Sequence, residues 1–136
     1  MNIGEIIEEF KYLDSWEDKY AFIIELGKDL PGLAENEKID LYKIKGCASQ
    51  VWLICEVKEG KLFCRGDSDS IIVKGLIGVL LSAYNYKKLD EIDNIDIENM
   101  FDTLGLKGHL SPNRSNGFFS MVNYIKSFSK QNSSNI

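Results

Sequence analysis

The sequence predicts an α+β protein, with a small antiparallel sheet of about three strands covered on one face by helices. Apolar residues recur at helical spacing at both ends of the chain. Between them, from Lys38 to Gly66, the residues favour β-strands instead. This order of helix, helix, strands and helices is typical of α+β folds, in which the two kinds of element are segregated along the chain.

The chain has the size of one domain, with 136 residues and no linker or internal repeat. Only the last residues form a polar run without apolar periodicity. We therefore expect a single domain over residues 1–128 and a polar C-terminal tail over residues 129–136.

Two helices are expected at the N-terminus. Apolar residues between Ile3 and Leu13 recur at helical spacing. Ser15 then offers an N-cap for a second helix, with Glu17 and Asp18 in its first turn. Gly27 marks the expected end of that helix.

The strand region contains a turn signal that sets a pairing register. β-forming residues occur around Leu41 and Ile44 and again from Val51 to Val57, followed by Glu59-Gly60. A turn on those two residues places Cys55 opposite Cys64. Alternate residues of each strand then face a common core.

Three helices are expected after the strands. The polar segment 67–69 supplies N-cap residues for a helix over residues 70–83. A short helix over residues 97–104 should end at Gly105, and a final helix should begin near Ser115 and carry apolar residues to Phe128.

Charge and composition exclude several classes of function. Lys and Arg number 16 against 21 Asp and Glu, a net charge of −5, which disfavours binding to a nucleic-acid backbone. The acidic N-terminus does not resemble a secretory signal, and the longest apolar run, residues 75–81, is too short to span a bilayer. Three cysteines, an odd number, do not suit a secreted disulfide framework. We therefore expect a cytoplasmic protein whose partners are proteins or small molecules, not membranes or nucleic acids.

Cys47 is the cysteine whose surroundings best suit chemistry. It lies in Gly46-Cys47-Ala48-Ser49-Gln50, a break between strand-like runs, where small neighbours leave room for a second sulfur. On pattern alone, a single cysteine in a loop is more often incidental than functional. Cys55 and Cys64 fall on the expected core face, where a free cysteine serves as a small apolar residue.

The residues alone leave other classes open. A metal- or cluster-binding scaffold could use Cys47, Cys64 and His109, although the cysteine spacing matches no zinc signature. A thiol-dependent redox enzyme would need a resolving cysteine. Arg114 precedes the last helix, where it could belong to an ordinary cap and turn, bind a partner carboxylate or lower a thiol pKa.

Several motifs, taken in order, resemble the SufE family of sulfur-acceptor proteins. These motifs are Gly46-Cys47-x-Ser49-Gln50-Val51-Trp52, Gly66-Asp67-Ser68-Asp69, Val73-Lys74-Gly75-Leu76 and His109-Leu110-Ser111-Pro112-x-Arg114-Ser115-Asn116-Gly117. Trp16-Glu17-x-Lys19-Tyr20 and Glu25-Leu26-Gly27-Lys28-x-Leu30-Pro31 extend the likeness toward the N-terminus. The resemblance runs from about residue 10 to residue 125 and implies a fold similar to that of the U-type Fe–S scaffolds.

The resemblance implies a sulfur carrier that is not itself an enzyme. Cys47 would take persulfide sulfur from a pyridoxal-phosphate-dependent (SufS-like) cysteine desulfurase, stimulate that enzyme and deliver sulfur to a SufBCD-like Fe–S scaffold complex. Arg114 matches an arginine implicated in working with the desulfurase, and Gln50 and Asp69 match positions around the cysteine. No metal and no cofactor of the chain's own is implied.

Two points stay open at this stage. The family usually has Gln directly after the cysteine, where this chain has Ala48. A related acceptor that serves a sister desulfurase shares the same motifs, so the partner is undecided, and a homodimer remains among the open oligomeric states. We also hypothesise that Cys47 rests turned inward, near Val51 and Trp52, and swings out when a partner docks.

Overall fold

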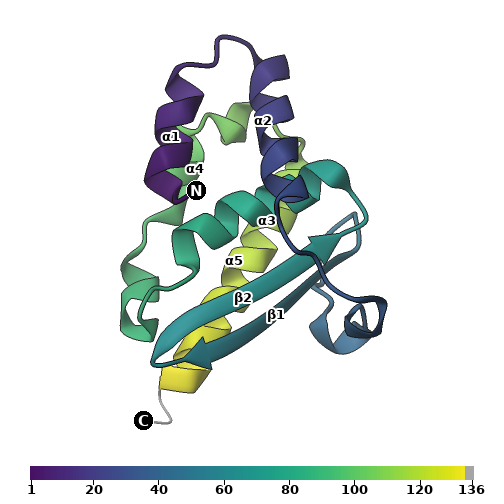
Figure 1. The fold of residues 1–136 in the computed structure, drawn as a ribbon, viewed down its shortest axis with the longest axis vertical. Coiled ribbons are helices and arrows are strands. Elements are labelled where there is room, and N and C mark those ends of the chain that lie inside the picture. The colour runs from purple at the N-terminus through teal and green to yellow at the C-terminus, as the bar shows by residue number, and fades with distance from the viewer. Residues whose placement is uncertain (134–136) are drawn as a thin grey trace.

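The computed structural model of the chain describes residues 1–133 and shows five α-helices and one β-hairpin there (Figure 1). The helices are α1 (Ile3–Lys11), α2 (Trp16–Lys28), α3 (Ile71–Tyr84), α4 (Ile97–Thr103) and α5 (Pro112–Ser133). The strands are β1 (Val51–Lys58) and β2 (Lys61–Ser68). Short 3₁₀ turns occupy Glu35–Glu37, Asp40–Tyr42, Leu89–Asn94 and Leu106–Gly108. The α+β class predicted from the sequence is confirmed.

The hairpin has the register that its turn residues predict. Glu59 and Gly60 both have positive φ angles, 52° and 76°, as a tight two-residue hairpin turn requires. Lys58 pairs with Lys61, and Cys55 pairs with Cys64.

The expected third strand is not present among the described residues, where the sheet has two strands. Residues 35–42 form two 3₁₀ turns instead, and only a single bridge joins Lys43 to Trp52. Ile39 and Leu41 are 44% and 74% exposed, so this segment has no continuous apolar face to bury against the core.

The helices α2 and α3 begin directly after the residues that cap them. The Ser15 hydroxyl accepts a hydrogen bond from the Asp18 N–H at 3.1 Å, and the Ser70 hydroxyl caps α3. The prediction for the last helix was wrong at its start, because α5 begins at Pro112 and not near Ser115. Proline suits the first helical position, since its fixed φ is helical and it has no N–H to leave unpaired.

The far end of α5 extends into the region expected to be a tail. Residues 129–133 belong to the helix, and Ser129 is buried. Residues 134–136 of that expected tail lie outside the described residues.

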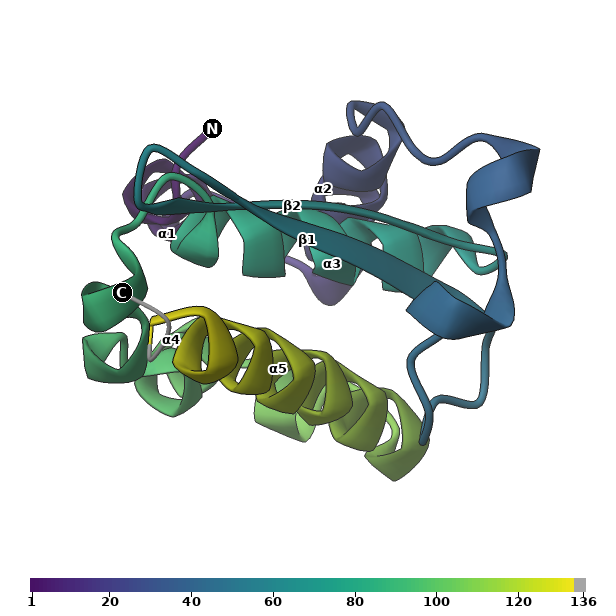
Figure 2. The ribbon, with the colours of Figure 1, turned by 90° about the horizontal axis from the view of Figure 1, so that it is seen from below.

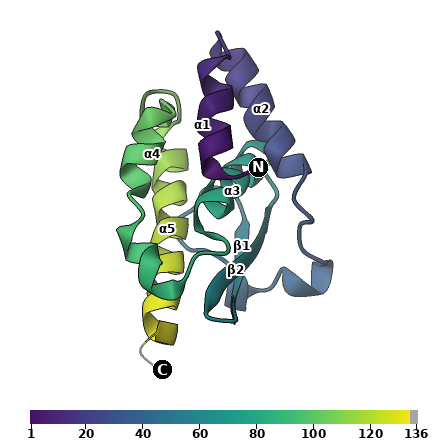
Figure 3. The same cartoon turned by 60° about the vertical axis from the view of Figure 1, so that its left-hand side comes forward.

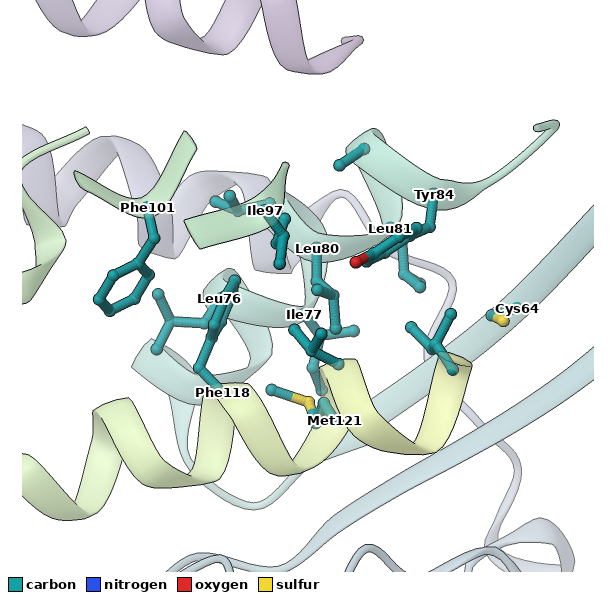
Figure 4. Packing of buried hydrophobic residues seen from close by; sticks show 14 of the residues in the cluster. Cys64, Leu76, Ile77, Leu80, Leu81, Tyr84, Ile97, Phe101, Phe118 and Met121 are labelled. Atoms are coloured by element: carbon teal, nitrogen blue, oxygen red, sulfur yellow. The ribbon is translucent and has the colours of Figure 1, made fainter. Parts of the chain in front are cut away.

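Helices cover one face of the hairpin. Figure 2 shows the hairpin edge-on with α5 along one side of it, and α3 lies beside β2. Leu53 and Cys64 belong to the main core on this side, and Figure 4 shows Cys64 in that core. Trp52 and Ile54 point to the other face, where Leu33 packs on them.

Close helix contacts complete the core. Backbone of α2 and α3 meets at Gly75, where an added Cβ would lie 2.3 Å from the carbonyl oxygen of Ile23. Such a distance is impossible for a real side chain, so this crossing requires glycine. Figure 3 shows α4 beside α5, and Phe101 and Phe118 join these two helices with ring centroids 5.0 Å apart.

No helix within residues 1–133 combines the length and the apolar character needed to cross a bilayer.

Candidate functional site

Cys47 lies in the short connection that leads into β1, next to a glycine in a left-handed conformation. Gly46 has φ +86°, and an added Cβ there would lie 3.0 Å from the Ser120 hydroxyl oxygen of α5. Both the positive φ and the close approach favour glycine at this position. The backbone turn at Gly46 is what places the following thiol against α5.

The Cys47 thiol faces the backbone of α5 at Gly117. Its Sγ is 3.7 Å from the Gly117 carbonyl oxygen, a contact at the length of a weak S–H···O hydrogen bond. A Cβ added to Gly117 would lie 3.3 Å from Sγ, which is closer than most real contacts. Gly117 thus leaves a notch on α5 in which the Cys47 sulfur lies, and we call this position the seat of Cys47. The inward orientation expected for Cys47 at rest is present.

Burial sets the acidity of this thiol. The Cys47 side chain is half-buried, and loss of hydration raises the pKa of its thiol above the ordinary value. The thiolate is the nucleophilic form of cysteine, so a raised pKa keeps the resting residue weakly reactive.

Gln50 and Asp69 are brought together at the end of the hairpin opposite its turn. The Gln50 N–H donates to the Asp69 carboxylate at 3.0 Å, and the Asp69 N–H donates to the Gln50 carbonyl at 3.3 Å. The Ser68 hydroxyl also donates to that carbonyl, at 2.7 Å. These bonds anchor the chain three residues after Cys47, so they limit how far the Cys47 connection can move.

Arg114 lies in the first turn of α5 and is exposed. Its backbone N–H donates to the Ser111 hydroxyl at 3.3 Å, and its guanidinium forms no ion pair with any residue in 1–133. Residues three apart on a helix share a face, so Arg114 lies one turn from Gly117, which contacts Cys47. A guanidinium without an ion-pair partner among residues 1–133 is suited to a carboxylate brought by another molecule.

The three residues of the metal-scaffold alternative are engaged separately. The His109 ring stacks on Trp16 with centroids 3.7 Å apart, and its Nδ1 lies 3.0 Å from the Gly105 carbonyl oxygen. Cys64 is buried opposite Cys55. Across residues 1–133, no three His, Cys, Asp or Glu side chains are grouped as metal ligands. Cys47, Cys64 and His109 do not form a common site.

Asp67 has a role near the site that the sequence did not reveal. Its buried carboxylate accepts hydrogen bonds from the Leu33 and Ser68 N–H groups at 3.0 and 2.8 Å, and Lys38 and Lys74 lie 3.6 Å away. Burial acts to raise its pKa, but these hydrogen bonds and lysine charges outweigh burial and lower the pKa. Asp67 therefore ties the segment after α2 to the end of β2, beside Asp69.

One known family matches almost the whole chain. A family model described as "SufE: Fe-S metabolism associated domain" matches residues 4–129 of the chain. The chain belongs to the SufE family. The match extends beyond both ends of the motifs that carried the resemblance, and it assigns the domain to iron–sulfur metabolism.

Individual relatives match over almost the whole chain. An uncharacterised SufE-like protein of Rhizobium meliloti (strain 1021) is 42% identical over 130 residues, covering 93% of each chain. Another, from Rhizobium etli, is 43% identical over 133 residues, covering 95% of this chain and 90% of its own. The SufE-family fold is also similar to the solution structure of a hypothetical protein from Thermus thermophilus, with a TM-score of 0.77 at 16% identity over 95% of this chain and 93% of that one.

Proposed function

We propose that this SufE-family protein accepts persulfide sulfur from a pyridoxal-phosphate-dependent cysteine desulfurase on Cys47, stimulates that enzyme and passes the sulfur to an Fe–S scaffold complex. The observation that supports this most is the seat of Cys47: its sulfur lies in the notch at Gly117, 3.7 Å from that carbonyl oxygen. The same cysteine stands in the family motif, and the family is associated with Fe–S metabolism.

The transfer is a thiol–disulfide type of exchange. After Cys47 loses its proton to water or to a base of the partner, its thiolate attacks the outer sulfur of the desulfurase persulfide. The S–S bond of the donor breaks, and the donor cysteine leaves as a thiolate. Cys47 then holds the transferred sulfur as a persulfide, until an acceptor takes it by the same chemistry. The chain needs no cofactor of its own for this exchange, because carbon–sulfur cleavage occurs on the partner.

Cys47 must leave its seat to meet a donor sulfur. Gly46 provides the backbone freedom for this movement, while the bonds between Gln50 and Asp69 hold the next part of the chain in place. We infer a short outward rotation of residues 46–49 when the partner docks. The raised pKa of Cys47 at rest then falls as the thiol leaves the low-dielectric seat.

Arg114 is the proposed contact to the desulfurase. Its guanidinium is exposed, has no ion-pair partner within residues 1–133 and lies one helical turn from the residue that seats Cys47. A bidentate bond to a carboxylate of the enzyme would orient the two cysteines toward each other. Ala48 stands where the family usually has Gln, so no amide side chain at this position shields a persulfide on Cys47.

Desulfurase turnover tests the proposal. Alanine formation by a cysteine desulfurase would be measured with cysteine as substrate, alone and with the wild-type chain, Cys47→Ser or Cys55→Ser. We expect stimulation by the wild type and by Cys55→Ser, and none by Cys47→Ser. Equal stimulation by Cys47→Ser would contradict a carrier role for Cys47.

A further inference from the structure

Cys55 and Cys64 lie directly opposite each other on β1 and β2. The Asn85 carboxamide pairs with the outer side of β2: it accepts from the Cys64 N–H at 2.8 Å and donates to the Cys64 carbonyl at 3.0 Å. Both backbone groups of Cys64 therefore point away from β1. Cys55 and Cys64 are thus a non-hydrogen-bonded pair, the arrangement that brings opposing side chains closest.

This arrangement has the dimensions of a disulfide. Opposing Cα atoms in a non-hydrogen-bonded antiparallel pair are about 4.5 Å apart. Disulfides join Cα atoms separated by about 4.4–6.8 Å, so the backbone need not move to form one. The facing Cys55 thiol, together with burial, raises the pKa of the Cys64 thiol. Both cysteines are free thiols in the structure.

The two thiols differ in access. Cys64 is 1% exposed and belongs to the packed core, at whose edge it is seen in Figure 4. Cys55 is partly exposed. An oxidant arriving from solvent therefore meets Cys55 first, and Cys64 stands where a resolving thiol would have to be.

We propose that Cys55 and Cys64 form a second thiol site, which a peroxide converts reversibly to a cross-strand disulfide, independently of Cys47. The Cys55 sulfur attacks one peroxide oxygen, the O–O bond breaks, and Cys55 becomes a sulfenic acid as one water leaves. The Cys64 sulfur, losing its proton, then attacks the Cys55 sulfur and expels a second water. The two thiols lose two protons and two electrons in total, and the peroxide is reduced to two waters.

The site is separate from sulfur carriage. Sulfur acceptance needs a single cysteine, whereas this reaction needs two that face each other. Cys55 and Cys64 lie on the two strands, on the face that the helices cover, and Cys47 lies on the connection before β1.

A cross-link between the strands also restricts the unfolded chain, which is the main way a disulfide stabilises a fold.

The test uses Cys47→Ser, so that Cys47 cannot form a mixed disulfide. The folded protein is treated with hydrogen peroxide, quenched in acid, unfolded in guanidinium with a thiol-blocking maleimide near pH 7, and analysed by intact mass and peptide mapping. We expect a mass about 2 Da lower, one bridge joining the peptides of Cys55 and Cys64, no maleimide on either, and full recovery with dithiothreitol. The control Cys47→Ser/Cys55→Ser should show no such loss.

Two results would overturn the proposal. One is oxygen addition at Cys55 while Cys64 still takes up maleimide. The other is that both thiols remain free under conditions that oxidise Cys47 in the wild type.

Discussion

The Cys47 sulfur rests against the α5 backbone, 3.7 Å from the carbonyl oxygen of Gly117. A side chain at Gly117 would reach this sulfur, since an added Cβ would be 3.3 Å from it. The absence of a side chain on one residue therefore determines where the reactive group of another residue can sit.

Gly117→Ala should push the Cys47 thiol out of its seat. Alanine favours the helix by up to about 1 kcal/mol over glycine, so the protein should stay folded while the connection shifts. We expect Cys47 to be alkylated by iodoacetamide several-fold faster than in the wild type, without any partner. Gly108→Ala is the matched control, because a Cβ at Gly108 meets no atom within 4 Å. Equal rates for the wild type and Gly117→Ala would show that Gly117 does not define the seat.

The pH profile of Cys47 alkylation should report its burial. Burial raises the thiol pKa, so the folded protein holds this proton more tightly than the unfolded chain does. The midpoint of the rate against pH should therefore lie above about 8.5, the value for an ordinary cysteine, and should fall toward it in urea. Cys55→Ser/Cys64→Ser isolates the signal of Cys47. A midpoint below that of the unfolded chain would mean that the resting thiol is activated instead.

Asp67→Asn should destabilise the fold without touching Cys47. It removes the charge that faces Lys38 and Lys74 in a buried position, and we expect a loss of about 1–3 kcal/mol in the free energy of unfolding, measured in urea. Glu9→Gln, on the exposed side of α1, is the control and should change the free energy of unfolding little.

Asp67 should also make the free energy of unfolding depend on pH. The pKa of Asp67 is lower in the folded protein than in the unfolded chain. Its stabilising effect is therefore complete above the ordinary carboxyl value of about 3.9 and is lost as the pH falls through the folded value. The difference in stability between the wild type and Asp67→Asn should shrink over that acidic range. A difference independent of pH there would contradict the ionised role of Asp67.

Arg114→Ala should weaken the interaction with the desulfurase and leave the fold intact. The side chain is exposed and forms no ion pair with residues 1–133, so the free energy of unfolding should change by less than about 0.5 kcal/mol. The concentration of this protein that gives half-maximal desulfurase stimulation should rise several-fold. Arg114→Lys should recover only part of this loss in apparent affinity, because lysine lacks the bidentate geometry of arginine. Lys130→Ala, at the other end of α5, is the control for loss of charge. Unchanged stimulation by Arg114→Ala would remove Arg114 from the proposed interface.

Local patterns predicted much of the fold because local interactions determine it. The hairpin register follows from Glu59-Gly60, since a two-residue turn leaves one pairing. Ser15 was likewise identifiable as a cap from its own neighbourhood. The prediction of a third strand was wrong because β-propensity at Leu41 does not make a strand unless one face of the segment is buried. Whether a face is buried depends on the rest of the fold.

The site was predictable in its nucleophile but not in its surroundings. The small residues around Cys47 and the family motif pointed to that thiol. Nothing local indicates that Gly117, 70 residues later and inside a continuous helix, would receive its sulfur. The partners of Asp67 come from the connection after α2 and from α3, so only the folded chain shows them.

Intact-protein mass spectrometry tests the central claim most directly. The protein would be incubated with an active cysteine desulfurase and cysteine, beside Cys47→Ser as control. The carrier account predicts a gain of about 32 Da, one sulfur, on the wild type only, removed by dithiothreitol. No gain on the wild type, or an equal gain on Cys47→Ser, would contradict sulfur acceptance at Cys47.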